Sequence, residues 1–375
     1  MPQDHAANTP QTSSRYDLGF PFHGRDSAKE RLAAIERFME ANGYNQEFLL
    51  SGDAVEDLEQ KIAQLFGKEA AIWCVTGTMA QSIAVRIYAD RRGKRGLLLH
   101  PTSHILLHEE EGYRHVHGLE VTTIGDPSAH LIADDLLPGA ACACIELPQR
   151  HTGGTLPSWQ DLEAIKVRAC DLGLPLHVDG ARLWSARLYY DSRSYAEIVD
   201  GFSSVYVSLY KDIGALGGAL LLGDRAFIEE AKLWRTRMGG LAAAAWPQIC
   251  DGLRLIDKRL DQMPAFVQRA QDIAAALQVN GKVRTSPHPP HTNMIHIELP
   301  CPMERAEAAR DAVAQETDVW LGSRFWPGGT PCSDDLSTCR LELTIGETAL
   351  NVPDTVLLEA IALLANLPPR PETSA

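Results

Sequence analysis

The sequence predicts an α/β protein, with a mostly parallel sheet in a large domain and a smaller C-terminal α+β domain. Short apolar runs alternate with amphipathic helical runs between about Asp53 and Asp224, as in a parallel sheet covered by helices on both faces. Beyond about Leu277 the pattern changes, and 375 residues are too many for one small core. We expect an N-terminal arm and helix over 1–50, a large domain over 51–265 and a small domain over 266–375.

The expected elements follow one another in a regular order. The first are a helix over 54–67, a strand over 71–75 and a helical run over 81–92. Further strands of the large domain are expected over 97–100, 121–125, 141–147, 174–179, 203–209 and 217–223, with a helix over 159–173. Helix is then expected from 226 through the Ala-rich segment 241–246 to about Leu277. The small domain should contain strands over 292–300 and 339–346 and helices over 305–315 and 354–367.

Composition argues against several classes of function. The formal net charge is -14 and no basic patch stands out, which argues against a nucleic-acid partner. No apolar run approaches the ~20 residues of a membrane helix. The polar N-terminus, MPQDHAANTPQTSSRYD, and the tail, PPRPETSA, are expected to be disordered, and the N-terminus does not resemble a secretory signal.

The eight cysteines are scattered without metal-ligand spacing, so we expect no metal site and a reducing, cytoplasmic compartment. Cys142 and Cys144 alternate with alanine in an apolar run, which favours small buried side chains.

Polar residues follow the expected strands where ligands bind in such sheets, beyond the carboxyl ends. Thr76-Gly77-Thr78 stands between a strand and a helix and would let a phosphate approach backbone N–H groups, or is an ordinary turn capped by Thr78. Asp179 ends an apolar strand, and a buried carboxylate needs a cationic or hydrogen-bonding partner. That partner is a protonated pyridine nitrogen or, structurally, Arg182.

Lys211 follows another apolar strand and precedes a glycine-rich turn in SLYKDIGALGG. A lysine at such a strand end can form a Schiff base with a cofactor aldehyde, and its apolar and small neighbours weaken the alternative of a surface lysine. Phosphate turn, carboxylate and lysine come in the order expected for a pyridoxal 5'-phosphate enzyme of the aspartate aminotransferase-like fold, fold type I.

Four segments resemble the low-specificity L-threonine aldolases of the beta-eliminating lyase family. They are LFGKEAAIWCVTGTMAQSIA, PTSHILLHEEEG, LPLHVDGARLWSA and RLELT. The resemblance runs from roughly Gly52 to the C-terminal helix. It implies a pyridoxal phosphate cofactor, an amino acid substrate and a homodimer or homotetramer with the active site at the dimer interface. Aromatic residues of Phe20–Asp26 and Tyr44–Ser51 would be covered there by the partner, or by their own domain.

The resemblance also assigns roles to residues. Gly77 and Thr78 would bind the phosphate, with Ser208 a weaker candidate. His104 would stack on the ring and help move protons, unless it is a structural histidine. Asp179 would bind the ring nitrogen and Lys211 would form the Schiff base.

The resemblance places two arginines at the substrate. Arg182 would grip the cofactor or the substrate carboxylate, and Arg340 would face that carboxylate, unless it lies on the solvated side of its strand.

The chain departs from the family where the substrate would bind. The family's N-terminal serine is missing from YDLGFPFHGRD. Gln149 takes the place of a histidine linked to the substrate hydroxyl, and His151 lies two residues on. A glutamine can bind a hydroxyl but cannot take its proton.

Two further segments depart as well. Tyr210-Lys211-Asp212 replaces a Ser-Lys-Gly pattern, and MGGLAAAAW lacks the family's arginine.

We therefore expect retro-aldol cleavage of a β-hydroxy-α-amino acid to glycine and an aldehyde. The alternatives are β-elimination or racemisation on the same cofactor, and a non-catalytic binding protein that keeps the fold.

Overall fold

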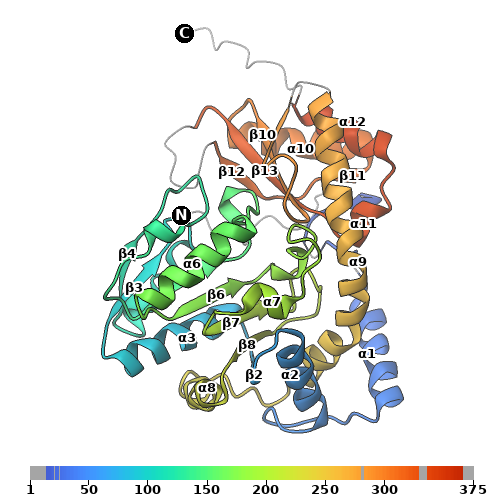
Figure 1. Cartoon of the computed structure of the whole chain (residues 1–375). Helices are drawn as coiled ribbons and strands as arrows, with labels where there is room; N and C mark the ends of the chain where they lie inside the picture. Colours follow the sequence, from blue (N-terminus) through green and yellow to red (C-terminus); the bar gives the residue numbers. More distant parts are fainter. Residues whose placement is uncertain (1–13, 21, 25, 280–282, 329–335, 366–375) are drawn as a thin grey trace. The chain divides into compact units, whose positions relative to one another are not determined.

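The computed structural model describes residues 14–20, 22–24, 26–279, 283–328 and 336–365 (Figure 1). Most of the N-terminal arm and all of the tail that we expected to be disordered lie outside the described residues. The contacts of the chain divide it into a large unit, Arg25–Pro264, and a small unit that joins the chain up to Gly24 with the chain from Ala265 onward. The three-part division into 1–50, 51–265 and 266–375 stays a prediction. The described residues 14–20 and 22–24 belong to the small unit.

The large unit is built on a seven-stranded sheet in the order β2-β8-β7-β6-β5-β3-β4. The strands are β2 (Ala70–Cys74), β3 (Gly96–Leu99), β4 (Glu120–Thr123), β5 (Cys142–Glu146), β6 (Leu176–Gly180), β7 (Ser204–Ser208) and β8 (Ala219–Gly223). Strand β8 runs antiparallel to β2 and β7, and the other neighbours are parallel. The mostly parallel sheet is confirmed. The carboxyl ends of β2, β3, β5, β6 and β7 consequently lie along one edge.

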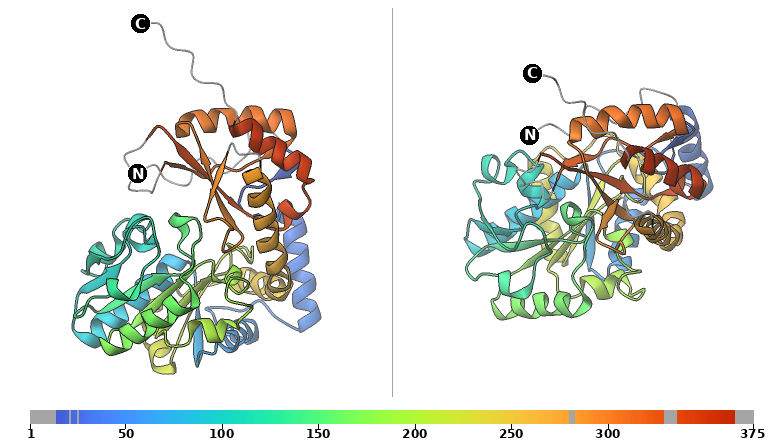
Figure 2. Two further views of the ribbon diagram at one scale, coloured as in Figure 1. Left: turned by 45° about the horizontal axis from the view of Figure 1, so that its top comes forward. Right: turned by 90° about the horizontal axis from the view of Figure 1, so that it is seen from above.

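Helices cover both faces of this sheet, which is why its central strands are apolar along their whole length. Figures 1 and 2 show α3 (Gly77–Arg92) and α6 (Trp159–Asp171) on opposite faces. The hydroxyl of Thr76 caps α3 by accepting the N–H of Met79 at 3.1 Å, so the cap is Thr76 and not Thr78. The other helical segments of the large unit are α1 (Ala28–Asn42), α2 (Asp53–Leu65), α4 (His104–Leu107), α5 (Gly112–His115), α7 (Tyr195–Val199), α8 (Arg225–Arg237) and the 3-10 turns η1 (Ala133–Asp135), η2 (Arg150–Thr152) and η3 (Leu183–Ser185).

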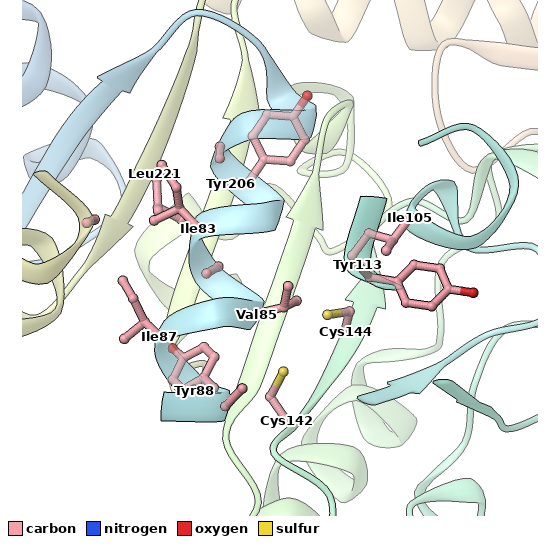
Figure 3. Close-up of a cluster of buried hydrophobic side chains, with 14 of the residues drawn as sticks. Ile83, Val85, Ile87, Tyr88, Ile105, Tyr113, Cys142, Cys144, Tyr206 and Leu221 are labelled. Carbon is pink, nitrogen blue, oxygen red and sulfur yellow. The ribbon is translucent and has the colours of Figure 1, made fainter. Parts of the chain in front are cut away.

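The core between α3 and the sheet is apolar and closely packed (Figure 3). Ile83 and Ile87 of α3 and Leu221 of β8 are fully buried in it. Cys142 and Cys144 belong to the same cluster at 0% and 3% exposure, so the prediction that they are small buried side chains is confirmed. This core anchors the first turn of α3 at the edge where the strands end.

The prediction of one continuous helix through 241–246 is wrong. Helix α8 ends at Arg237, the chain is not helical over 238–245, and α9 (Trp246–Val279) starts afresh. Gly239 adopts the left-handed conformation with φ 72°, which ends the helix. A Cβ on Gly240 would overlap the sulfur of Met79, so the chain passes close to α3 here.

The small unit contains an antiparallel sheet in the order β12-β13-β10-β9, as an α+β domain requires. Residues Tyr16–Asp17, expected to be part of a disordered arm, instead form strand β1 and pair in parallel with β11. Phe22 is 3% exposed and packs against Phe20 within this unit, so its own domain covers it without a partner subunit. The elements are β9 (Arg284–Ser286), β10 (Met294–Leu299), β11 (Val319–Trp320), β12 (Phe325–Pro327), β13 (Cys339–Thr344), α10 (Met303–Thr317), α11 (Glu347–Leu350) and α12 (Asp354–Ala365).

A search of the described residues for a helix long and apolar enough to cross a membrane finds none.

Candidate active site

The candidate residues of the large unit gather at the edge of the sheet where its parallel strands end. Gly77 and Thr78 begin α3 after β2, and His104 begins α4 after β3. Asp179 lies at the end of β6 and Lys211 three residues beyond β7. The charges of Asp179 and Arg182 both act on the amine of Lys211, and the amine of Lys211 acts on His104. The structure thus brings together the residues that the sequence predicted as the cofactor site.

Lys211 is a buried lysine, 8% exposed. Burial and, after it, the guanidinium of Arg182 lower the pKa of its amine from 10.5 to about 7, while Asp179 opposes the shift. A neutral amine carries the lone pair that attacks an aldehyde carbon, which a fully charged surface lysine does not. The alternative of a surface lysine is therefore excluded by its burial.

Asp179 is buried between two neighbouring strand ends. It stands opposite Glu146 of β5 and Tyr206 of β7 in the sheet register. Burial raises the pKa of its carboxyl group, whereas Lys211 and the N–H of Ala181, which donates to Oδ1 at 3.1 Å, lower it. The guanidinium of Arg182 lowers it as well. Both roles of Asp179, as partner of a ring nitrogen and as structural partner of Arg182, stay predictions.

The first turn of α3 offers backbone N–H groups and the positive end of a helix to an anion. Gly77 is required there by packing, because a Cβ at this position would overlap the hydroxyl of Tyr206. Thr78 hydrogen-bonds Glu109, which lies after α4. Ser208 is fully buried and its hydroxyl already donates to the carbonyl oxygen of Ala181 at 2.7 Å, so it remains the weaker candidate for a phosphate contact.

His104 is held by a carboxyl group that the sequence did not single out. Its Nδ1 lies 3.0 Å from Oε1 of Glu109, and the amide of Gln81 on α3 donates to the same oxygen at 3.1 Å. Burial, then the charge of Asp179, raises the pKa of Glu109 to about 8. Burial and the amine of Lys211 hold the pKa of His104 well below its usual value. His104 is thus a neutral, oriented imidazole at neutral pH.

Gln149 is buried, 2% exposed, at the end of the segment that follows β5. Its side-chain nitrogen donates to Oγ1 of Thr102 at 3.0 Å and to Oε2 of Glu146 at 3.4 Å. Glu146 also accepts the N–H of Arg150 at 2.9 Å, and burial raises its pKa to about 7. Gln149 is therefore a fixed polar group beside the site.

Two further histidines lie next to His104. Nε2 of His108 is 2.7 Å from Nε2 of His151, and the two rings stack with centroids 5.0 Å apart. The ring of His108 is in turn 5.2 Å from that of His104. The short helix α4 and the turn η2 bring these side chains together from separate parts of the sequence.

Arg340 lies on β13 of the small unit, opposite Glu298 of β10. Burial lowers the pKa of its guanidinium and Glu298 opposes the shift, so Arg340 does not lie on a fully solvated side of the strand. Its assignment to the substrate carboxylate stays a prediction, because it belongs to the other unit.

The donor groups of the large unit fit pyridoxal phosphate. The buried amine of Lys211 suits its aldehyde, the buried carboxylate of Asp179 suits a protonated ring nitrogen, and the first turn of α3 suits its phosphate.

Comparison with known proteins agrees with this fit. Residues 33–300 match the beta-eliminating lyase family. Low-specificity L-threonine aldolase 1 of Arabidopsis thaliana is 28% identical over 255 residues, 64% of this chain and 71% of that protein. A solved structure from Listeria monocytogenes EGD-E, provisionally described as an L-allo-threonine aldolase, is 31% identical with a TM-score of 0.84, covering 94% of this chain and 96% of the other. A serine palmitoyltransferase from S. paucimobilis, solved with bound PLP, shares the fold at 16% identity and a TM-score of 0.67, covering 94% of this chain and 85% of the other.

The chain belongs to the beta-eliminating lyase family. It is a pyridoxal phosphate-dependent lyase of the threonine aldolase-like kind, with the type I fold of these enzymes. It is therefore an enzyme, and the alternative of a non-catalytic binding protein falls away.

Proposed function

We propose that this lyase cleaves a β-hydroxy-α-amino acid into glycine and an aldehyde. The observation that carries the proposal is the buried pair formed by Lys211 and Asp179 at neighbouring strand ends, with the pKa of the lysine lowered to about 7. Bound pyridoxal phosphate supplies an electron sink for the electron pair released at the α-carbon. The residues of the chain bind it, orient the substrate and handle protons.

Lys211 would bond to the cofactor aldehyde, and Asp179 would keep the ring nitrogen protonated. Gly77 and Thr78 would hold the phosphate at the start of α3. His104 would lie against the ring, since Glu109 fixes its orientation through Nδ1.

Two arginines and Gln149 would contact the substrate. Arg182 is close enough to Lys211 to lower its pKa, and this nearby positive charge supports a role in binding the substrate carboxylate. Arg340 would grip that carboxylate through two parallel hydrogen bonds. Gln149 would hydrogen-bond the substrate hydroxyl.

A second candidate function is β-elimination or racemisation on the same cofactor. Gln149 favours it, because an amide whose nitrogen donates to Thr102 cannot accept the hydroxyl proton that retro-aldol cleavage releases. Both candidates need Lys211 and Asp179, so the products decide between them.

The experiment is a screen of purified enzyme against L- and D-β-hydroxy amino acids, with the products quantified. Retro-aldol cleavage gives equal amounts of glycine and aldehyde. Elimination gives a 2-oxo acid and ammonia, and racemisation changes only the optical rotation. A 2-oxo acid as the main product would replace the first proposal with the second.

We also infer that the enzyme is a homodimer or homotetramer with the active site at the dimer interface. The support is an exposed apolar loop: Phe48 is 63% exposed and Leu49 41%. The N–H of Leu49 donates to the carbonyl oxygen of Ala243 at 3.1 Å, next to Leu241, which is 36% exposed. A second copy of this chain would cover these side chains. Sedimentation should show an oligomer that Phe48→Asp weakens, whereas an active monomer would contradict the inference.

A cytoplasmic location is proposed on the scattered cysteines, which are unpaired among the described residues. An amino acid substrate and no nucleic-acid partner are proposed on the charge of -14. Fractionation of cells that express the tagged enzyme tests the location.

A further inference from the structure

Gln81 is a buried polar side chain beside the active site that the proposed function does not use. It lies in the second turn of α3 and is 1% exposed. Its nitrogen donates to Oε1 of Glu109 at 3.1 Å, and its side chain also hydrogen-bonds the carboxyl group of Asp179. Its oxygen has no partner among the described residues, so the nitrogen and the two carboxyl groups set the orientation of the amide.

Asp179 holds one side of this amide. The N–H of Ala181 donates to its Oδ1 at 3.1 Å, and the charges of Lys211 and Arg182 favour its ionised form. An ionised carboxylate can only accept hydrogen bonds, so it keeps the nitrogen of Gln81, and not the oxygen, turned toward the two acids.

The amide of Gln81 then decides where the hydrogen atoms lie around Glu109. An amide nitrogen can only donate, so Oε1 of Glu109 has to act as an acceptor. The Nδ1 atom of His104 lies 3.0 Å from the same oxygen, and an accepting oxygen requires that this nitrogen carry a hydrogen.

The second ring nitrogen of His104 follows from the first. Burial, then the charge of Lys211, holds the pKa of His104 well below its usual value, so the ring is neutral at neutral pH. A neutral imidazole carries a single N–H. With that hydrogen on Nδ1, Nε2 keeps a bare lone pair.

Protonation of Glu109 leaves this arrangement in place. Burial, then the charge of Asp179, raises the pKa of Glu109 to about 8, so this carboxyl group binds a proton at neutral pH. Because Oε1 accepts from Gln81, the proton belongs on Oε2. The hydroxyl of Thr78, which also hydrogen-bonds Glu109, can accept as well as donate. Gln81 therefore sets the tautomer of His104 whether or not Glu109 is ionised.

We propose that Gln81 is a positioning residue of the active site, which acts through Glu109 to fix His104 in the tautomer with hydrogen on Nδ1. Nδ1 is engaged with Glu109, so Nε2 is the nitrogen that remains for hydrogen bonds to other groups. It accepts such bonds and cannot donate them. The use of this tautomer in catalysis rests on the function proposed above, in which His104 lies against the cofactor ring.

The first test reads the tautomer directly. The enzyme loaded with pyridoxal phosphate and labelled with ¹⁵N at histidine is examined by NMR, which separates bare from hydrogen-bearing ring nitrogens. The signals of His104 are assigned by their loss in His104→Asn. The wild type should show hydrogen on Nδ1 and a bare Nε2.

Gln81→Leu removes the donor and keeps an apolar side chain in the buried position. Glu109 can then place its proton on Oε1 and donate it to Nδ1, so the hydrogen of His104 should appear on Nε2 at neutral pH. Gln64→Leu is the matched control, because Gln64 is an exposed glutamine on the helix α2, and it should leave the spectrum unchanged.

Glu109→Gln tests the same order of donors without changing Gln81. The nitrogen of Gln81 still requires an acceptor in front of it, so the new amide should turn its oxygen to Gln81 and His104. His104 should therefore keep its hydrogen on Nδ1. Hydrogen on Nε2 in this variant would show that Gln81 does not set the tautomer, even if Gln81→Leu does not fold.

The second readout is the split between kcat and KM. Gln81→Leu should lower kcat about tenfold, the lower end of the effect of losing a partner that orients a ligating histidine. KM should stay within about twofold of wild type, a difference under ~1 kcal/mol, because Gln81 is assigned no contact with the substrate. Gln64→Leu should change neither constant.

The remaining outcomes are also decisive. Hydrogen on Nε2 in the wild type, or an unchanged tautomer in Gln81→Leu, overturns the proposal. A shifted tautomer with kcat within about twofold of wild type shows that Gln81 does not position His104 for the reaction. If the wild type has the expected tautomer but releases no aldehyde from any β-hydroxy amino acid, the proposed function fails while the assignment of the tautomer stands.

Discussion

The two halves of the active-site edge follow different rules. The half at the ends of β6 and β7, with Asp179 and Lys211, keeps the residues that the family resemblance implies, and both are buried. The half formed after β3 and β5 keeps His104 but departs from the resemblance after β5, with Gln149 in place of a histidine and a His108–His151 pair beside it. In the proposed function, the first half would hold the cofactor and the second half would decide which bond of the substrate breaks. Substitutions in the first half should therefore abolish cofactor binding or turnover, whereas substitutions in the second half should change which products form.

Lys211→Ala should have the largest effect, because it removes the only amine placed at the end of β7 in the described sheet. Turnover should fall to background and the protein should lose its visible cofactor absorbance. Lys68→Ala is the control, since Lys68 is also a lysine whose pKa is lowered by burial but it bonds the carbonyl oxygens of Val199 and Phe202. Activity in Lys211→Ala above about one per cent of the control would show that turnover does not depend on Lys211.

Asp179→Asn should bind cofactor but lose at least about a hundredfold in turnover, as when one electrostatic partner of the reacting group is removed. The neutral amide cannot hold the ring nitrogen protonated. Turnover and cofactor affinity are measured together. Turnover within about threefold of wild type, less than ~1 kcal/mol, would make Asp179 structural.

Arg340→Ala should raise KM at least about tenfold while cofactor affinity stays constant, because a charged hydrogen bond to the substrate is lost. Steady-state kinetics with the best substrate of the screen give both constants. An unchanged KM would show that Arg340 does not bind the substrate carboxylate.

Gly77→Ala should lower cofactor affinity and cost about 1–3 kcal/mol of stability, as expected for overpacking. The reason is the overlap of the new Cβ with the hydroxyl of Tyr206. Gly96→Ala is the matched control, because no atom lies within 4 Å of a Cβ at Gly96. Equal melting temperatures and equal cofactor affinities for the two variants would show that Gly77 is not tightly packed.

Glu109→Gln isolates a carboxyl group that both halves share. The pKa of Glu109 is raised to about 8 in the folded protein from an ordinary 4.5, so the folded state binds the extra proton between these values. The stabilisation is complete below pH 4.5 and is lost as pH rises through 8. Relative to the glutamine variant, the wild type should lose at least ~1.4 kcal/mol of unfolding free energy from pH 5 to pH 9, the equivalent of one pKa unit. A constant difference would show that Glu109 is ionised throughout.

The sequence predicts the first half far better than the second. Asp179 and Lys211 stand at the ends of apolar runs that are long enough to be recognised as strands, so their place in a parallel sheet follows directly. Gln81 and Glu109 escaped notice because one lies in an apolar helix and the other in a charged run, HEEEG, that looks solvated. Gln81 is 1% exposed, and its role becomes clear only when the folded structure brings it to its hydrogen-bond partner Glu109.

The His108–His151 pair escaped notice in the sequence for the same reason. His108 and His151 are 43 residues apart, and only the folding of α4 and η2 brings their nitrogens together. Likewise, the break at Gly239 and the pairing of Tyr16–Asp17 with β11 depend on contacts with other segments, which local propensity does not record.

The most direct test of the account is to find the amine that holds the cofactor. The enzyme loaded with pyridoxal phosphate is reduced with borohydride, digested and mapped by mass spectrometry. The account predicts a pyridoxyl group on Lys211 alone, in the segment that follows β7. Label on Lys68 or on any other lysine, with Lys211 unmodified, would contradict it.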